Sequence, residues 1–158
     1  MIEQIIPYFT FLTALGSGLV SGLFFAFSSF IMKALGRLSV DHGIATMQSI
    51  NKTVLNYSFF VVFMGTTLTT VLLMIYSLFH WNQPNAIYLL VGSAFYLLGS
   101  FLVTAVYNVP LNNALEKLDT ENEKSVTVWK KYMVKWTAWN HVRTVTSFLA
   151  CGSFILAL

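Results

Sequence analysis

The chain has 158 residues, of which 56% are hydrophobic and only 9% are charged, and its mean hydropathy is +0.69. A soluble domain carries about 25% charged residues, so this composition excludes an ordinary water-soluble domain and indicates a protein embedded in a bilayer. Nine basic residues give a net charge of +3 without forming a dense run, which argues against a nucleic-acid partner.

Four apolar stretches are long enough to cross a bilayer, which takes about 20 residues per helix. They cover approximately residues 5–32, 54–79, 86–109 and 137–158. None has the alternation of a membrane β-barrel, so helices are the predicted spanning form. The connections are short, which favours antiparallel neighbours. We therefore predict an all-α fold in which residues 1–158 form a single domain, an integral membrane four-helix up-down-up-down bundle.

The basic residues lie in or beside only two of the three connections. Those of the first connection are Lys33, Arg37 and Lys52, and those of the third are Lys117, Lys124, Lys130, Lys131 and Lys135. By the positive-inside rule these two connections face the cytoplasm, and both termini lie on the other side of the membrane.

Helical extensions are predicted on this cytoplasmic side of the bundle. Asp41 suits the cap of a helix that starts near His42 and runs into the second span. Residues 126–136 have the pattern of a short interfacial helix that leads into the fourth span. Pro110 is expected to end the third helix at the interface. Gly18 and Gly22 of the first span suit close helix packing, either within the bundle or in a homo-oligomer.

Polar residues are costly inside apolar spans, and here they gather near the cytoplasmic ends of three of them. The set consists of Asn51 and Asn56; Thr104, Asn108 and Asn112; and Asn140, His141, Arg143, Thr144 and Ser147. Antiparallel threading brings all of them to one level, which predicts a polar cavity with aromatic walls. Taken singly, each has a simpler reading: an asparagine can bond a neighbouring helix, and Arg143 can snorkel to the headgroups.

His141 is the predicted base of this cavity, because an imidazole with its ordinary pKa near 6.5 can accept a proton at neutral pH. No carboxylate lies in the spans, so a Ser-His-Asp triad is not supported. A metal or haem held by His42 and His141 would need the first connection to fold over the bundle. We therefore predict no metal site and no cofactor. Arg143 and the asparagines would stabilise an enolate or phenolate of a flat, apolar, weakly acidic molecule.

Four sequence blocks resemble the small four-span membrane family that includes the fungal anthrone oxygenases and many bacterial members. They are "GLFFAFSSFIMKAL" (22–35), "GIATMQSIN" (43–51), "NVPLN" (108–112) and "WTAWNHVRT" (136–144). The resemblance implies an enzyme of the bacterial cytoplasmic membrane that oxidises an anthrone to an anthraquinone with O2 and without a cofactor. Lys33 departs from the family pattern, in which a proline is expected there, and His42 is not part of that pattern.

On this basis His141 is predicted as the base, with Arg143, Asn140 and Asn108 as stabilisers of the oxyanion or peroxide. The residues predicted to position the lipophilic substrate are Asn51, Asn56, Asn112 and Trp139. Two other hypotheses use the same residues differently. A carrier would bind a lipophilic molecule without turnover, and a small structural subunit of a membrane complex would use the polar residues only to join helices.

Overall fold

The structure is a computed structural model that describes residues 2–119 and 124–158. These residues form helices and connecting turns without any β-strand, so the prediction of an all-helical protein is confirmed for them. In chain order the elements are α1 (Ile2–Ala26), the π-helix η1 (Phe27–Ile31), α2 (Met32–Leu35), α3 (Val40–Thr53), α4 (Tyr57–Phe79), α5 (Ala86–Ala94), the π-helices η2 (Phe95–Leu102) and η3 (Thr104–Asn108), α6 (Val109–Glu116) and α7 (Lys124–Leu156).

Three helices are long and apolar enough to cross a membrane, and they support a membrane location for the protein. They are Glu3–Leu35, which joins α1 to α2, Tyr57–Phe79, and Ala86–Glu116, which joins α5 to α6. The continuous helix α7 contains the predicted fourth span, but Asn140, His141 and Arg143 lower the hydropathy of that part. A fourth span therefore stays a prediction.

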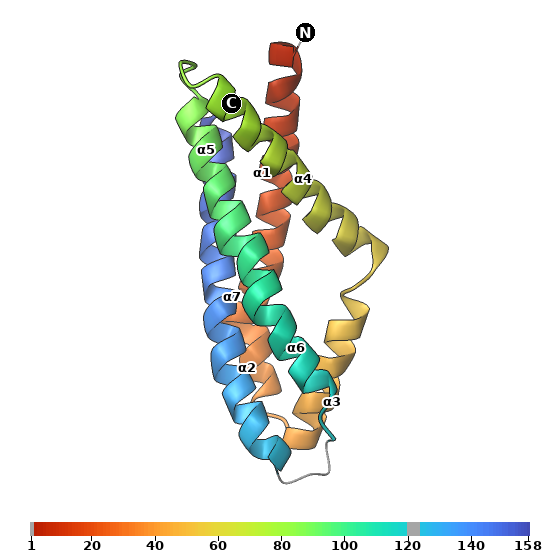
Figure 1. Cartoon of the computed structure of the whole chain (residues 1–158). Helices are drawn as coiled ribbons and strands as arrows, with labels where there is room; N and C mark the ends of the chain where they lie inside the picture. Colours follow the sequence, from red (N-terminus) through yellow and green to blue (C-terminus); the bar gives the residue numbers. More distant parts are fainter. Residues whose placement is uncertain (1, 120–123) are drawn as a thin grey trace.

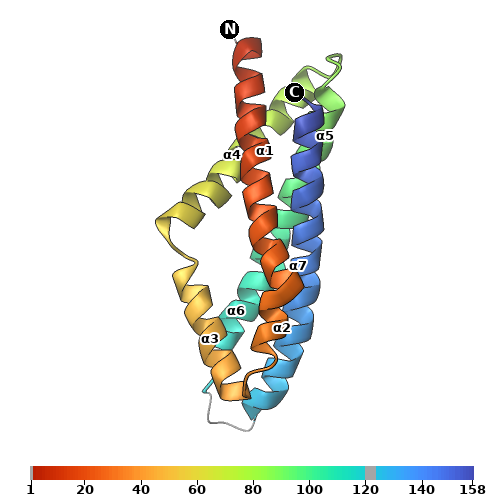
Figure 2. The same ribbon diagram turned by 180° about the vertical axis from the view of Figure 1, so that it is seen from behind.

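The helices do not pack as evenly as the predicted four-helix bundle. The rod from α1 to α2, the rod from α5 to α6, and α7 lie side by side, whereas the first turns of α4 diverge from them (Figures 1 and 2). Accordingly, α4 packs against α1, α5 and η2, while η3 and α6 pack against α7. Both chain ends lie at one end of the molecule, and α2, α3 and α6 lie at the other (Figure 1). The regular bundle is thus not confirmed.

Two expectations about helix ends are wrong. Pro110 does not end the third helix; it lies in the first turn of α6, directly after the π-helical turn η3. A proline is tolerated in a first turn, and a π turn changes the backbone hydrogen bonds just before it. The helix predicted near His42 is α3, which begins at Val40, but it stops at Thr53 instead of running into the second span. A separate start of α4 follows, capped by Asn56.

Two apolar cores fill the interior. The first core lies towards the end that holds the termini and includes Phe63, Leu73, Tyr96 and Phe154. The second core lies among α2, α3, α6 and the start of α7. It is made of Phe27, Met32, Leu35, Ile44, Met47, Leu115, Trp129, Tyr132 and Trp136. Polar side chains of α7 lie between the two cores, and the π-helical turns η1, η2 and η3 pack against this part of α7. Such turns are often found at functional sites.

Candidate functional site

Arg143 is the centre of the candidate site. It lies on the inner face of α7, and only 4% of the residue is exposed. Its Nη2 donates to Oδ1 of Asn140 at 2.7 Å, and its Nη1 donates to Oγ1 of Thr104 at 3.3 Å. The guanidinium lies over the ring of Phe24 at 4.0 Å and over that of Trp136 at 5.1 Å. Backbone packing, side-chain hydrogen bonds and aromatic rings therefore hold it in one orientation.

No carboxylate within the described residues neutralises this guanidinium. Ion pairs among these residues join His42 to Asp41 and Lys52 to Glu116, all of them on or near the surface. The Nε of Arg143 is buried and has no hydrogen-bond partner among the described residues. A buried charge without a counter-ion loses its hydration and gains only weak compensation from neutral dipoles and rings. An anionic ligand would supply the missing charge, which makes Arg143 a candidate binding group.

Asn140 fixes the position of Arg143 and is itself fully buried. Its Nδ2 donates to the carbonyl oxygen of Phe24 and to Oγ of Ser28, each at 2.7 Å. Ser28 belongs to the π-helical turn η1, and its hydroxyl also contacts Oγ1 of Thr144 at 3.0 Å. Since Oδ1 of Asn140 accepts from Arg143, this one amide connects the first rod to the guanidinium. The arrangement makes Asn140 a positioning residue.

Asn112 of α6 is held by two aromatic donors of α7. Its Oδ1 accepts from the hydroxyl of Tyr132 at 2.9 Å and from Nε1 of Trp136 at 2.7 Å. Burial raises the pKa of Tyr132 well above its ordinary value, so the hydroxyl stays protonated and remains a donor. Oδ1 is occupied in this way. The amide nitrogen of Asn112 makes no hydrogen bond to the described residues that we identify, so it remains a donor for a ligand.

Asn51 of α3 completes the polar lining. Its side chain lies beside the hydroxyl of Tyr132. Its buried Nδ2 has no hydrogen-bond partner among the described residues. A buried amide nitrogen without a partner is uncommon and costs about 1–3 kcal/mol. Asn51 is therefore a second buried donor, besides Arg143, that a ligand oxygen could satisfy.

These groups line a narrow cavity of about 90 Å³. Its polar lining consists of Asn51, Thr104, Asn112 and Arg143. The apolar lining consists of Leu23, Phe24, Phe27, Met47, Ile50, Val54, Leu55, Phe59, Val109 and Trp136. The cavity thus combines one cation and amide donors with aromatic and aliphatic walls. That combination suits a flat apolar ligand that carries one acidic oxygen.

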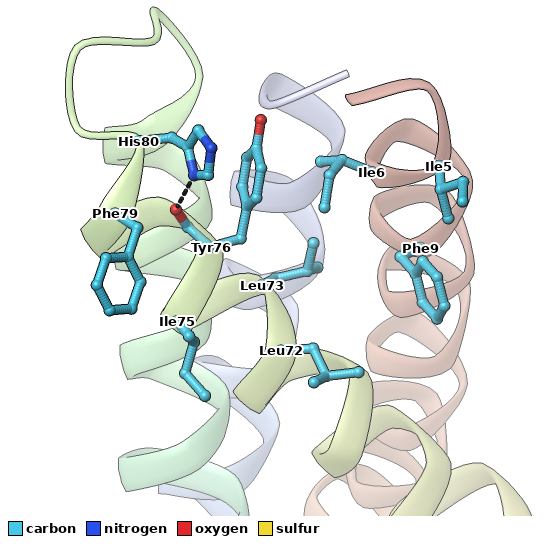
Figure 3. Close-up of a pocket in the computed structure, with 9 residues that line it drawn as sticks. All are labelled: Ile5, Ile6, Phe9, Leu72, Leu73, Ile75, Tyr76, Phe79 and His80. Atoms are coloured by element: carbon cyan, nitrogen blue, oxygen red, sulfur yellow. Dashed lines mark hydrogen bonds between the residues drawn. The ribbon is translucent and has the colours of Figure 1, made fainter. Parts of the chain in front are cut away.

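A second hollow, at the end of the molecule that holds the termini, has a different character. It is lined by Ile5, Ile6, Phe9, Leu72, Leu73, Ile75, Tyr76, Phe79 and His80 (Figure 3). Its one imidazole is engaged, since Nδ1 of His80 lies 3.0 Å from the carbonyl oxygen of Tyr76 and the two rings stack. None of the predicted site residues lines this hollow, which has almost no polar surface.

Four of the eight predicted site residues come together in this region: Asn51, Asn112, Asn140 and Arg143. Asn108 lies next to them without lining the cavity. It is 1% exposed, its Nδ2 donates to the carbonyl oxygen of Trp136 at 3.2 Å, and its Oδ1 has no partner among the described residues.

The structure does not bring the other three predicted residues into the cavity. His141 is exposed, because it lies one residue after Asn140 and therefore about 100° further around α7. Trp139 also lies off the inner face, and its ring stacks on that of Tyr107 at 3.7 Å. Asn56 caps α4, where its Oδ1 accepts from the backbone N–H of Phe59 at 3.0 Å. These three residues therefore do not line the cavity in this structure, and their predicted roles stay predictions.

Sequence reasoning did not assign a role to Thr104, Tyr132 or Ser28, which hold the polar residues in place. Thr104 had a signal, since it shares a helical face with Asn108 and Asn112. Tyr132 follows Trp129 and precedes Trp136 on the buried stripe of α7, which helical spacing could have identified. The contact of Ser28 depends on the π-helical turn η1, for which no sequence signal was available.

Comparison with known proteins supports the same family as the sequence blocks. The family model described as anthrone oxygenase matches residues 52–153. This range covers more than half of the chain and includes Asn112, Asn140 and Arg143, but it begins one residue after Asn51. No curated protein and no solved structure gives a significant match. The chain belongs to the anthrone oxygenase family.

Proposed function

We propose that this protein is a membrane-embedded oxygenase that acts, without a cofactor, on an anthrone or a similar apolar phenolic molecule. The observation that carries the proposal is Arg143, a buried guanidinium without a carboxylate partner among the described residues, at the wall of a largely apolar cavity. An anthrone matches the chemistry of this lining because it is flat and apolar and its single oxygen becomes negatively charged when the molecule ionises. Its three rings are larger than the cavity of about 90 Å³, so the side chains of the lining must part to admit it.

We further propose that residues 137–158 form a fourth span beside the three apolar helices. In this arrangement the basic connections face the cytoplasm and both termini lie outside it. The site then lies within the membrane towards its cytoplasmic side. Burial of polar groups at that depth is expected where they face protein or a cavity rather than lipid. The substrate, O2 and the bilayer are the partners in this proposal, and no second protein is needed.

The proposed reaction converts the methylene carbon of the anthrone into a ketone. Loss of a proton gives an enolate, whose carbon donates electrons to O2 and forms a carbon–oxygen bond. The resulting hydroperoxide then loses water. The methylene carbon is oxidised by four electrons and O2 is reduced by four, with one oxygen atom kept in the quinone and the other released as water. Arg143 would stabilise the enolate oxygen through charge.

His141 is the predicted base, but its exposed side chain does not line the cavity. We propose instead that the site selects a substrate that has already ionised, so that no base is needed inside the cavity. The phenolic tautomer of an anthrone resembles tyrosine, whose ordinary pKa is about 10. A small fraction is then anionic at neutral pH, and pairing with buried Arg143 favours that fraction strongly.

The asparagines take different parts in this proposal. Asn140 positions the guanidinium, while Asn51 and Asn112 offer amide donors to the substrate oxygen or to the peroxide. Asn108 supports α7 from behind the cavity. Asn56 and Trp139 act only through structure, by capping α4 and by stacking on Tyr107.

The test is O2 uptake with anthrone, measured as a function of pH on protein in lipid vesicles. Selection of the anion predicts that kcat/KM rises about tenfold per pH unit up to about pH 10. A histidine base predicts instead a rise that ends near pH 6.5, the ordinary imidazole pKa. His141→Gln should therefore keep its activity, and Arg143→Gln should lose it. Uncatalysed oxidation is subtracted with vesicles that contain no protein.

Each other outcome has a definite meaning. A plateau near pH 6.5 that disappears in His141→Gln would restore the histidine as the base and refute selection of the anion. Saturable binding of anthrone without O2 uptake at any pH would refute the oxygenase and favour the carrier hypothesis.

A further inference from the structure

The first turns of α4 diverge from the rod that runs from α5 to α6 (Figures 1 and 2). An apolar groove of about 440 Å³ lies at this part of α4. It is lined by Leu55, Asn56, Tyr57, Phe59, Phe60, Phe63, Met64, Thr104 and Val109. Because α4 packs against α1, α5 and η2 further along, the opening is confined to the beginning of α4.

This groove adjoins the cavity of Arg143. Four residues line both: Leu55, Phe59, Thr104 and Val109. Thr104 also accepts a hydrogen bond from Arg143, so the inner end of the groove reaches the guanidinium. Phe59 stands between the two spaces, with its ring stacked on that of Phe63 at 5.4 Å.

The rim of the groove is apolar and faces outward. Leu55 is 78% exposed, Tyr57 is 83% exposed and Phe60 is 61% exposed. Tyr57 and Phe60 belong to a helix that is long and apolar enough to cross a membrane. Large apolar residues on the outside of such a helix face acyl chains in a bilayer, so the mouth of the groove opens towards lipid.

The opposite approach to Arg143 is covered by protein. The second apolar core packs α2, α3, α6 and the start of α7 together, and Met47, Leu115 and Trp129 within it are almost fully buried. A molecule arriving from the basic connections would have to part this core. A molecule arriving through the groove meets instead an aromatic ring, Phe59, that is only partly buried.

We propose that the substrate of the site reaches Arg143 sideways from the bilayer, through this groove, and that Phe59 controls its passage. The inference rests on the proposed function for the identity of its ligand class, a flat apolar molecule with one anionic oxygen. Such a molecule concentrates in the membrane because of its apolar rings. Its charge then draws the oxygen inward to the guanidinium.

The experiment follows binding rates of 9-anthracenecarboxylate, a flat tricyclic anion, in protein-containing vesicles. The protein used keeps Trp136, which lines the cavity, and has Phe in place of its other three tryptophans. Energy transfer from Trp136 to the anthracene then reports the arrival of the probe in the cavity. In a Cys151→Ser background, Met64→Cys places a single thiol on the lining of the groove and outside the cavity of Arg143. A bulky maleimide on that thiol would obstruct the groove. Phe148→Cys, exposed on α7 and outside the groove, is the matched control.

Obstruction of an entrance changes rates more than affinity. We expect the label on Met64→Cys to slow association and dissociation at least tenfold each, with the affinity changed less than threefold. The label on Phe148→Cys should change neither. Phe59→Ala, which needs no label, should accelerate both rates. Arg143→Gln should abolish binding through loss of the anion's partner.

Unchanged rates in labelled Met64→Cys and in Phe59→Ala would overturn the inference, since the probe would then enter elsewhere. A loss of affinity that matches the loss of association rate would also overturn it, because the groove would then be part of the bound site. Failure of the wild type to bind the probe would do the same. The proposed function fails separately, if the probe binds and enters as expected but anthrone causes no O2 uptake.

Discussion

Replacement of Arg143 by methionine separates a functional cation from a structural one. Methionine is apolar and of similar length, so the substitution removes the charge but keeps most of the packing against Phe24 and Trp136. We expect Arg143→Met to lose O2 uptake with anthrone by about 10²–10³-fold, which is the usual cost of removing one oxyanion-stabilising donor. We also expect its free energy of unfolding to stay within about 2 kcal/mol of the wild type.

The expected stability follows from opposing effects at the site. Loss of the guanidinium leaves Oδ1 of Asn140 without its donor, at a cost of about 1–3 kcal/mol. It also removes two contacts with aromatic rings, worth about 0.5–2 kcal/mol each when desolvated. The opposing effect is the desolvation of the Arg143 guanidinium, which has no carboxylate partner among the described residues. This desolvation costs the wild-type protein several kcal/mol, and Arg143→Met removes that cost. Thr104 keeps its own bond to the carbonyl oxygen of Ser100.

The assay combines two measurements on the same preparation. Unfolding is followed by loss of helical circular dichroism as dodecyl sulfate is added to protein in mild micelles, and O2 uptake is followed in vesicles. Arg143→Lys is the matched control, because it keeps the charge but cannot reach both Asn140 and Thr104 with a fixed fork of donors. A drop in stability above about 4 kcal/mol in Arg143→Met, or retained turnover, would refute the assignment of Arg143 to a ligand site.

Three further substitutions test the surroundings of the site, and two of them have a matched control. Asn140→Ala should destabilise the protein by about 3 kcal/mol, measured in the same titration, because a buried carbonyl oxygen and a guanidinium lose their partner. Asn56→Ala should cost about 1 kcal/mol through loss of the helix cap, and Asn56→Asp should restore most of it without affecting turnover. Gly99→Ala should lower the midpoint of unfolding, since a Cβ there would collide with Thr146, whereas Gly65→Ala, which meets open space, should not.

The inner face of α7 could be predicted from the sequence because its polar residues follow helical spacing. Asn140, Arg143 and Ser147 are separated by three and four residues, and all three are buried. The prediction of His141 as the base depended on the chemistry of its imidazole and not on this spacing. Adjacent helical residues point about 100° apart, so the same spacing that selects Arg143 places His141 elsewhere.

The divergence of α4 and the π-helical turns could not be predicted in this way. A hydropathy pattern identifies which segments are apolar, but Val54, Leu55 and Asn56 have no feature that fixes the angle at which α4 leaves α3. Asn56 was predicted as a polar residue at the start of a span, and only the observed helix start identifies it as a cap. A π-helical turn depends on one shifted hydrogen bond per turn, which leaves side-chain periodicity almost unchanged over a short helix.

The position of Arg143 between two apolar cores explains how one cation can serve a ligand that arrives from lipid. A guanidinium free to move would turn towards headgroups or water, since long basic side chains snorkel. Here Asn140 and Thr104 hold two of its nitrogens, and Phe24 and Trp136 lie against it. Because neutral dipoles and rings compensate a charge only in part, orientation is fixed while most of the attraction for an anion is retained. A carboxylate in place of Asn140 would orient the guanidinium equally well but would cancel that attraction.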